Sequence, residues 1–411
     1  MKRQERILLF LLATINFTHI LDFMIMMPLG NFLMPHFDIS AQYFSLIVAA
    51  YPVTAFVSGM IAAFYVDKYD RKKVLLFAYT GFIIGTITCG IANTAFLLMA
   101  ARVLTGLFGG LIGAQVLSII ADTFPYEKRG HAMATVFMAF SMASVFGVPF
   151  SLYLAKLISW HAPFIFIGIL GIVLLPFLQK YLPSISGHLK LAEIQDAANE
   201  KSGKKTATSI KDVFASVFSN RSQTLALLLS GLLMMGHFVI IPFINPYMEF
   251  NVGFTKDQTP LIYMVGGVCA MASSTFIGKL ADRLGKLKVF TVCLLLSLLP
   301  IFLITNMPSI PFYYVLIVFG FWFTFSTGRN IPAQAMISTV VNPEQRGQFM
   351  SFNSSFQQLF TGAASIIAGL IVVRDAQGKI YHYNWVGYLS ITIVFACWFI
   401  GRMLAKKQQL K

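Results

Sequence analysis

The sequence predicts an all-α integral membrane protein with twelve transmembrane helices in two pseudo-symmetric six-helix bundles. Of its 411 residues, 57% are hydrophobic and only 11% are charged. A soluble helical protein interrupts its apolar runs with charges every few residues, whereas these runs extend for about twenty residues, the length that crosses a bilayer. A single water-soluble core is therefore excluded.

Twelve apolar runs are expected to form the helices. They do not alternate apolar and polar residues at every second position, so transmembrane strands describe them poorly. The first run is too long for a signal peptide and lacks a cleavage site, so it is expected to remain as a helix. The expected spans lie near residues 7–29, 42–66, 74–92, 94–121, 130–156, 162–182, 222–248, 259–281, 289–306, 311–340, 347–373 and 384–404.

The basic residues predict the orientation of these spans. With the N-terminus in the cytoplasm, 25 of the 31 Lys and Arg residues fall on the cytoplasmic side. Cytoplasmic loops retain Lys and Arg during insertion, so both termini are expected to be cytoplasmic. The net charge of +15 lies in short clusters between apolar runs, which indicates membrane orientation rather than nucleic-acid binding.

One long polar segment, residues 183–221, divides the chain. It separates an expected N-terminal bundle, residues 1–182, from an expected C-terminal bundle, residues 222–411. Within it, residues 189–198 carry apolar side chains at helical spacing, so either a short amphipathic surface helix or a flexible linker fits the cytoplasmic segment.

The two sides of this segment repeat one another. The loop Asp67–Lys73 matches Asp282–Lys288 at an offset of 215 residues, and Arg129 matches Arg346 at an offset of 217. Two charged motifs at nearly equal offset indicate a duplicated six-helix unit with parallel halves. The four cysteines lie inside apolar runs without CxxC spacing, so neither a disulfide framework nor a metal site is predicted, and no cofactor is expected.

At these motifs the sequence resembles the major facilitator superfamily. The segment from Gly278 through Asp282, Arg283 and Gly285 to Lys288 follows the family's loop signature, with Leu287 as the one departure in its basic tail. The N-terminal copy has Asp70 where the family has a glycine. Asp can adopt the left-handed conformation that a tight turn requires, so Asp70 need not abolish the turn.

Three features are similar to the twelve-helix drug:proton antiporter branch, which includes sugar-efflux and multidrug exporters. Asp22 lies in a first-helix acidic motif, and Arg102 begins a fourth-helix arginine motif. The segment Ala143–Pro149 is a degraded form of the fifth-helix antiporter signature. The resemblance implies transport by antiport.

Asp22 and Arg102 are ionisable residues inside predicted spans, at compatible depths. A buried charge costs about 2.5–3.5 kcal/mol on insertion scales, so each requires a partner or a function. Asp22 is expected to carry a proton when its surroundings close, with Arg102 controlling that state. The alternative is a static salt bridge between the first and fourth helices. His19, one turn before Asp22, could shuttle protons or be a structural histidine.

Other polar residues within the spans are candidates for a substrate cavity, because an amide or phenol in a span requires a partner. For any single one of them, a hydrogen bond between two helices is the favoured alternative. For Arg329 an inner-gate ion pair or snorkelling toward the cytoplasm is favoured over a substrate or anion contact. The candidates are Asn16, Tyr51, Gln115, Asn245, Arg329, Gln334, Asn353, Gln357 and Gln358.

The charged loop motifs are expected to form cytoplasmic gates. Their acidic residues end helices beside helix termini and basic side chains, so charge-assisted contacts could latch the halves in an outward-open state. Incidental surface pairs that only mark topology are the alternative. The residues are Asp67, Arg71, Asp122, Glu127, Arg129, Gly278, Asp282, Arg283, Gly285, Glu344 and Arg346.

The sequence therefore predicts a monomeric secondary active transporter in a bacterial inner membrane. Proton-coupled export of small organic molecules is favoured, with an uptake symporter or facilitator on the same fold as the alternative. The expected partners are the substrate, protons and the lipid bilayer. No catalytic cluster, zinc motif or phosphate loop is present, so neither an enzyme nor an ATP-driven pump is expected.

Overall fold

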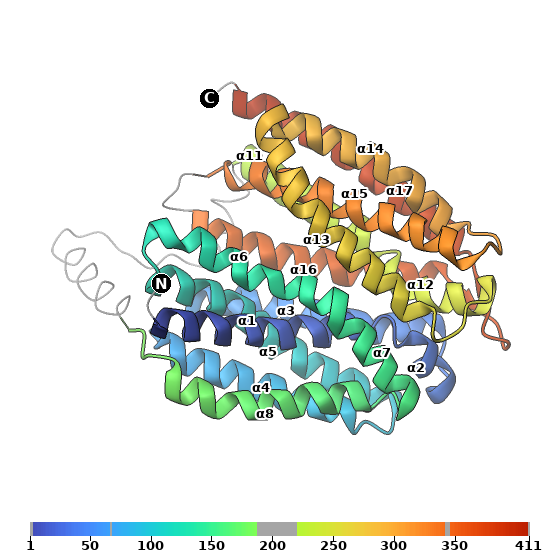
Figure 1. The fold of residues 1–411 in the computed structure, drawn as a ribbon, viewed down its shortest axis with the longest axis horizontal. Helices are drawn as coiled ribbons and strands as arrows, with labels where there is room; N and C mark the ends of the chain where they lie inside the picture. The colour runs from blue at the N-terminus through green and yellow to red at the C-terminus, as the bar shows by residue number, and fades with distance from the viewer. Residues whose placement is uncertain (1–2, 66–67, 187–219, 342–345, 410–411) are drawn as a thin grey trace.

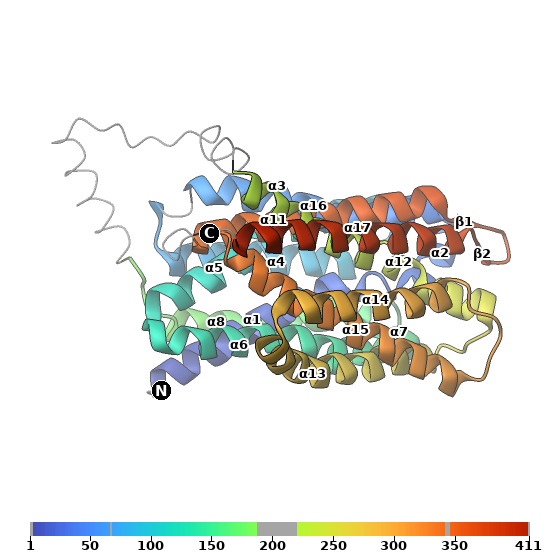
Figure 2. The same cartoon turned by 90° about the horizontal axis from the view of Figure 1, so that it is seen from above.

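The structure is a computed structural model that describes residues 3–65, 68–186, 220–341 and 346–409 (Figure 1). The possible amphipathic helix at 189–198 lies outside the described residues. The helices form two bundles that lie side by side, and both termini lie toward the same end of the molecule (Figures 1 and 2). We call this the terminal end and the opposite one the far end.

The N-terminal bundle contains the first six predicted spans. Its elements are α1 (Arg3–Ile25), α2 (Gly30–Phe37), α3 (Ala41–Tyr65), α4 (Arg71–Gly90), α5 (Ala95–Thr123), α6 (Tyr126–Met142), the π-helix η2 (Ala143–Gly147), α7 (Val148–Leu157) and α8 (Ala162–Tyr181).

The C-terminal bundle contains the other six. Its elements are α11 (Arg221–Phe238), α12 (Ile241–Tyr247), the π-helix η3 (Met248–Val252), α13 (Thr259–Leu284), α14 (Lys286–Thr305), α15 (Phe312–Ser338), α16 (Arg346–Ile371), the two-residue antiparallel strands β1 (Val373–Arg374) and β2 (Ile380–Tyr381), and α17 (Tyr383–Gln409).

The helices confirm the predicted fold. Ten spans are long and apolar enough to cross a membrane. The remaining two predicted spans are α15 and α16, which have 27 and 26 residues and are therefore about 40 Å long at 1.5 Å per residue. All twelve predicted spans are thus helical in the described part of the chain.

Capping side chains explain where several helices begin. Asn220 accepts a hydrogen bond from the backbone N–H of Ser222 at 3.0 Å, and Thr94 accepts one from Leu97 at 3.1 Å. Asp70 accepts from Lys72 at 2.8 Å and from Lys73 at 3.4 Å. These bonds satisfy N–H groups that have no partner within the helix.

The conformation of Asp70 corrects the expectation of a left-handed turn. Its φ is −58° and its side chain caps α4, whereas Gly285 in the C-terminal copy has a φ of +93° between α13 and α14. The two copies therefore turn differently: the glycine supplies a backbone conformation that other residues rarely adopt, and the aspartate supplies a cap.

Close contacts between α3 and α16 join the two halves along their length (Figure 2). The helices run antiparallel, so that Gly59 faces Ser355 and Gly362 faces Val53. A Cβ atom at Gly362 would lie 2.6 Å from the Cγ2 of Val53. Small residues at such positions allow helices in a membrane to approach closely.

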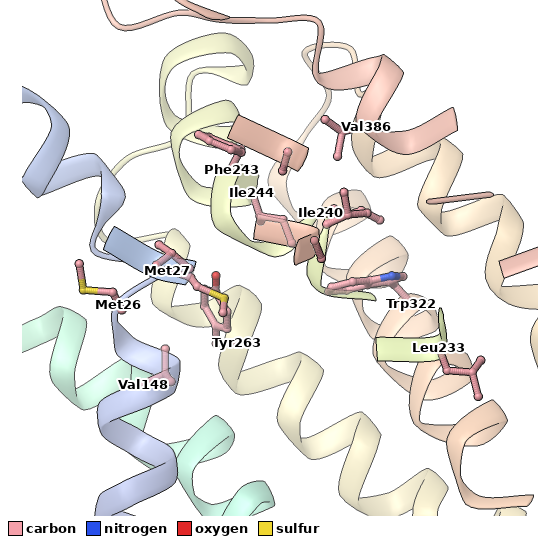
Figure 3. Packing of buried hydrophobic residues seen from close by; sticks show 14 of the residues in the cluster. Met26, Met27, Val148, Leu233, Ile240, Phe243, Ile244, Tyr263, Trp322 and Val386 are labelled. Atoms are coloured by element: carbon pink, nitrogen blue, oxygen red, sulfur yellow. The ribbon is translucent and has the colours of Figure 1, made fainter. Parts of the chain in front are cut away.

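The halves also meet at the far end, where one hydrophobic cluster continues across the interface. Met27, in the turn that follows α1, lies close to Ile244 of α12 and Tyr263 of α13 (Figure 3). A second cluster, around Leu12 and Ile120, contains only residues of the N-terminal half. The structure is therefore closed at the far end.

Two interruptions lie in this closed region and were not predicted. The predicted helix 130–156 contains the π-helix η2, and the helix predicted at 222–248 is broken after Phe238 and continues through α12 into η3. The backbone N of Val145 in η2 lies 3.0 Å from where a Cβ of Gly267 in α13 would be. Such π-helical segments are frequent at functional sites, and η2 lies within the segment that resembles an antiporter signature.

Candidate functional site

The centre of the N-terminal half contains a buried ion pair. Nη1 of Arg102 in α5 donates to Oδ2 of Asp22 in α1 at 2.6 Å, and neither side chain has any exposed surface. A charged hydrogen bond of this length in a dry interior is strong, and each charge would be costly alone. The two residues lie 80 positions apart, so the fold brings together the pair that was proposed from their depths.

The surroundings of the pair fix both side chains. Thr86 of α4 donates to Oδ1 of Asp22 at 3.2 Å. The guanidinium of Arg102 lies 4.7 Å from the centre of the Tyr51 ring, a distance at which cation–π attraction operates. His19 packs against the rings of Tyr51 and Phe82 at 6.1 and 6.0 Å. The ion pair therefore joins four helices, α1, α3, α4 and α5.

A second group of polar contacts crosses between the halves at the far end. The Asn245 amide donates to the carbonyl of Pro28 at 3.1 Å, and Asn31 donates to the carboxylate of Glu249. Lys156 forms an ion pair with Asp257, but this pair is largely exposed. Each contact joins an N-terminal element to a C-terminal one, so separation of the halves at this end would break all three.

Glu249 is a functional candidate that the sequence analysis missed. It lies just beyond the helix predicted over residues 222–248. The span instead continues to Val252, so that it includes Glu249. The sequence feature that could have identified Glu249 is the apolar run, which continues beyond this single charged residue. Seven other residues line a small pocket together with Glu249: Pro28, Asn31, Phe32, Leu152, Asn245, Lys256 and Thr259.

The remaining cavity candidates are mostly buried within the bundles. Asn16 donates to the carbonyl of Val136 at 3.1 Å, which joins α1 to α6, and Gln357 donates to Ser230 at 2.6 Å, which joins α16 to α11. These two make the helix-to-helix bonds that were the alternative to substrate contact. Gln115 and Asn353 are buried, whereas Gln334 and Gln358 are half-buried.

Arg329 departs from the favoured expectation. Its side chain has no exposed surface, so it does not snorkel, and no carboxylate within the described ranges lies within 4.0 Å of it. Nη1 donates to the hydroxyl of Ser297 in α14 at 2.7 Å. The sequence indicated only that an arginine lies in this span, because its partners come from other helices.

The motif residues at the terminal end divide into two groups. Nε of Arg71 pairs with Asp122 at 3.1 Å, which joins α4 to α5 within one half. Gly278 is in α13, and Asp282 and Arg283 near its end are exposed; neither forms an ion pair with another described residue. Asp67 and Glu344 lie outside the described residues, as do the side chains of Glu127, Arg129 and Arg346.

The duplicated fold and the buried charges can be compared with known proteins. The family profile described as Major Facilitator Superfamily matches residues 12–239 and, a second time, residues 226–410. The chain belongs to the major facilitator superfamily. It is therefore a multi-pass integral membrane transporter and not an enzyme.

Individual relatives agree with this assignment. The MFS-type transporter YbcL of Bacillus subtilis is 22% identical over 342 residues, which cover 83% of this chain and 82% of YbcL. Multidrug resistance protein 3 of Bacillus subtilis is 32% identical over 151 residues, 37% of this chain and 30% of that protein. The crystal structure of a D-xylose-proton symporter matches 95% of this chain and 97% of that one, with a TM-score of 0.74 and 14% identity. This last similarity shows the fold alone.

Proposed function

We propose that this transporter exports small organic molecules in exchange for protons, by alternating access. The observation that carries the proposal is the buried ion pair of Asp22 and Arg102. A carboxylate without exposure that is held by a single arginine has two stable states, one paired and one protonated, and these are what coupling to protons requires. The partial similarity to Multidrug resistance protein 3 and the Ala143–Pro149 segment favour export.

The proposal assigns each end of the molecule to one side of the membrane. The positive-inside pattern supports an orientation with both termini in the cytoplasm of a bacterial inner membrane, in which the closed far end faces outward. Opening of the far end would expose Asp22 to external protons. Protonation releases Arg102 from its partner, the halves rock back, and loss of the proton to the cytoplasm restores the pair. The chain works as a monomer with lipid, substrate and protons as its partners, and without nucleic acid.

The test is accumulation of a fluorescent dye and a panel of antibiotics in an efflux-deficient bacterium that expresses the transporter. Wild-type protein should lower accumulation of at least one compound, and Asp22→Asn at equal expression should abolish this effect. Asp38→Asn is the matched control, because Asp38 is exposed and its φ of +49° suits asparagine equally well. Unchanged export in Asp22→Asn would refute proton coupling through this residue.

Uptake by symport remains the second candidate because it would use the same pair. Everted membrane vesicles with an imposed pH gradient separate the two directions. Addition of an exported substrate should release protons from vesicles that are acidic inside, whereas a symporter would take up protons and substrate together.

A further inference from the structure

The most unusual charge in the molecule is Arg329, in the interior of the C-terminal half. Its side chain is fully buried, and its one hydrogen bond to a described residue runs from Nη1 to Ser297 at 2.7 Å. Its Nε and Nη2 atoms have no hydrogen-bond partner among the described residues. These two nitrogens form one edge of the guanidinium, the edge that donates two parallel hydrogen bonds to a carboxylate.

Other buried hydrogen-bond donors without partners among the described residues lie on the same face of α15 as Arg329. Trp322, Ser326 and Arg329 are spaced by four and three residues in α15, so they share one face of the helix. The indole nitrogen of Trp322 and the hydroxyl of Ser326 are buried and lack partners in the part of the chain that the structure describes. His237 of α11 stacks on Trp322 with the ring centres 4.8 Å apart, and its Nδ1 also lacks a partner there.

The duplicated N-terminal half offers a comparison. At the offset of 215 residues that relates Asp67 to Asp282, the counterpart of Asp22 is His237. Nε and Nη2 of Arg102 also have no hydrogen bond to another described residue, but the carboxylate of Asp22 balances the charge. The C-terminal half therefore contains a buried arginine and several hydrogen-bond donors. It has His237 at the position where the N-terminal half has Asp22.

We propose that this donor cluster binds a carboxylate group carried by the transported molecule. The guanidinium edge of Arg329 would hold both carboxylate oxygens, while Ser326, Trp322 and His237 donate to the same anion or orient it. The inference rests on the proposed transport function and adds a substrate class to it: small organic acids or zwitterions.

The geometry favours a planar oxyanion over a halide. Two adjacent, parallel N–H groups can each donate to one oxygen of a carboxylate, whereas a spherical ion gains only from the positive charge of the guanidinium. Arg329 is fully buried in this conformation, so the ligand enters when α11 and α15 separate. The break that follows Phe238, one residue after His237, is where α11 can bend for this to happen.

The experiment measures thermal unfolding of the purified full-length transporter in detergent while sodium benzoate is added. Sodium chloride and the neutral analogue benzamide serve as comparison ligands at equal concentrations and equal total ionic strength. The wild type should be stabilised by benzoate with saturation, and not by the other two. Arg329→Gln should weaken this effect at least tenfold, and Ser326→Ala should weaken it severalfold.

Two further variants make the result specific. Arg402→Gln makes the same chemical change at an exposed arginine on α17 and should leave benzoate stabilisation intact. Arg329→Lys keeps the charge but loses the two-pronged edge, so it should fold and still bind benzoate at least tenfold more weakly, even if Arg329→Gln does not fold.

Stabilisation that survives in Arg329→Lys or Arg329→Gln, or that chloride matches, would overturn the proposal, as would its absence in the wild type. Because the assay uses no pH gradient, it does not depend on proton coupling. Asp22→Asn should keep the benzoate effect, so loss of pH-driven transport and loss of anion binding remain distinguishable.

Discussion

Removal of the Asp22 charge should destabilise the folded transporter strongly, and removal of both charges should not. Nη1 of Arg102 lies 2.6 Å from Oδ2 of Asp22 with both side chains fully buried, so the charge centres are about 4 Å apart. At an effective dielectric constant near 20 this corresponds to about 4 kcal/mol. The same range, about 3–5 kcal/mol, is typical for removing one member of a buried pair.

The two single substitutions should differ in a way that identifies the physical cause. In Asp22→Asn, Arg102 stays charged at any accessible pH and keeps the Tyr51 ring and the backbone carbonyl of residue 22 but no carboxylate, so the loss of unfolding free energy should not shrink in mildly acidic solution. In Arg102→Met, the isolated carboxylate can take up a proton, so the loss should shrink in mildly acidic solution. The double variant should lie within about 1 kcal/mol of the wild type, because a desolvated pair contributes little net stability.

The assay is equilibrium unfolding in mixed micelles of increasing SDS content, followed by tryptophan fluorescence, for the four proteins of the cycle. The coupling free energy from the cycle should be about 3–5 kcal/mol. A double variant as unstable as Asp22→Asn would refute the reasoning, because the loss would then come from packing rather than from charge. A loss below about 1 kcal/mol in Asp22→Asn would show that the carboxylate is already neutral in the folded protein.

Three further predictions concern contacts away from this pair. Partial burial raises the pKa of Asp70, but hydrogen bonds from Ser184 and from the backbone N–H groups of Lys72 and Lys73 outweigh it, and the pKa lies below its usual value. The cap should therefore stabilise α4 at neutral pH and weaken as the pH falls through that lowered pKa. In thermal unfolding, Asp70→Ala should cost about 1 kcal/mol at pH 7 and less at pH 3, and Asp70→Asn should cost little. Gly267→Ala should disfavour the closed far end by about 1–3 kcal/mol, because the new Cβ would lie 2.7 Å from the Cγ2 of Val145. Cysteine accessibility at the far end should rise, while Gly113→Ala, with nothing within 4 Å, should leave it unchanged. Lys156→Met should change the same accessibility by less than about fivefold, because exposed ion pairs contribute at most about 1 kcal/mol, and a larger change would contradict that estimate.

Several parts of the fold were predictable because they depend on local sequence. The length of each apolar run determines whether it spans a bilayer, and the repeated charged loops reveal the duplication without any structure. The interruptions within the helices were harder to predict from the sequence. The run through Phe238 and Glu249 is apolar enough for one span, although Pro242 and Pro246 within it lack backbone N–H donors and so give a local signal for an interruption.

The candidate site was predictable only in part. Asp22 and Arg102 were identified because charges are rare in spans, and their depths made a pair reasonable. The same reasoning applied to Arg329 favoured an ion pair or an exposed end, and the structure has neither among its described residues. The difference depends on which side chains other helices place nearby, Ser297 and His237, and no property of the α15 sequence specifies them.

By itself, the sequence determined that this protein crosses the membrane with twelve helices in two related halves. The length of each apolar run and the positions of the charged residues are properties of the sequence itself, so they can be determined without a structure. Only the tertiary structure decided which buried charges have partners and at which end the halves are closed. Those properties depend on contacts between helices distant in sequence, such as Asp22 with Arg102 and Asn245 with Pro28, and on close packing that local sequence does not specify.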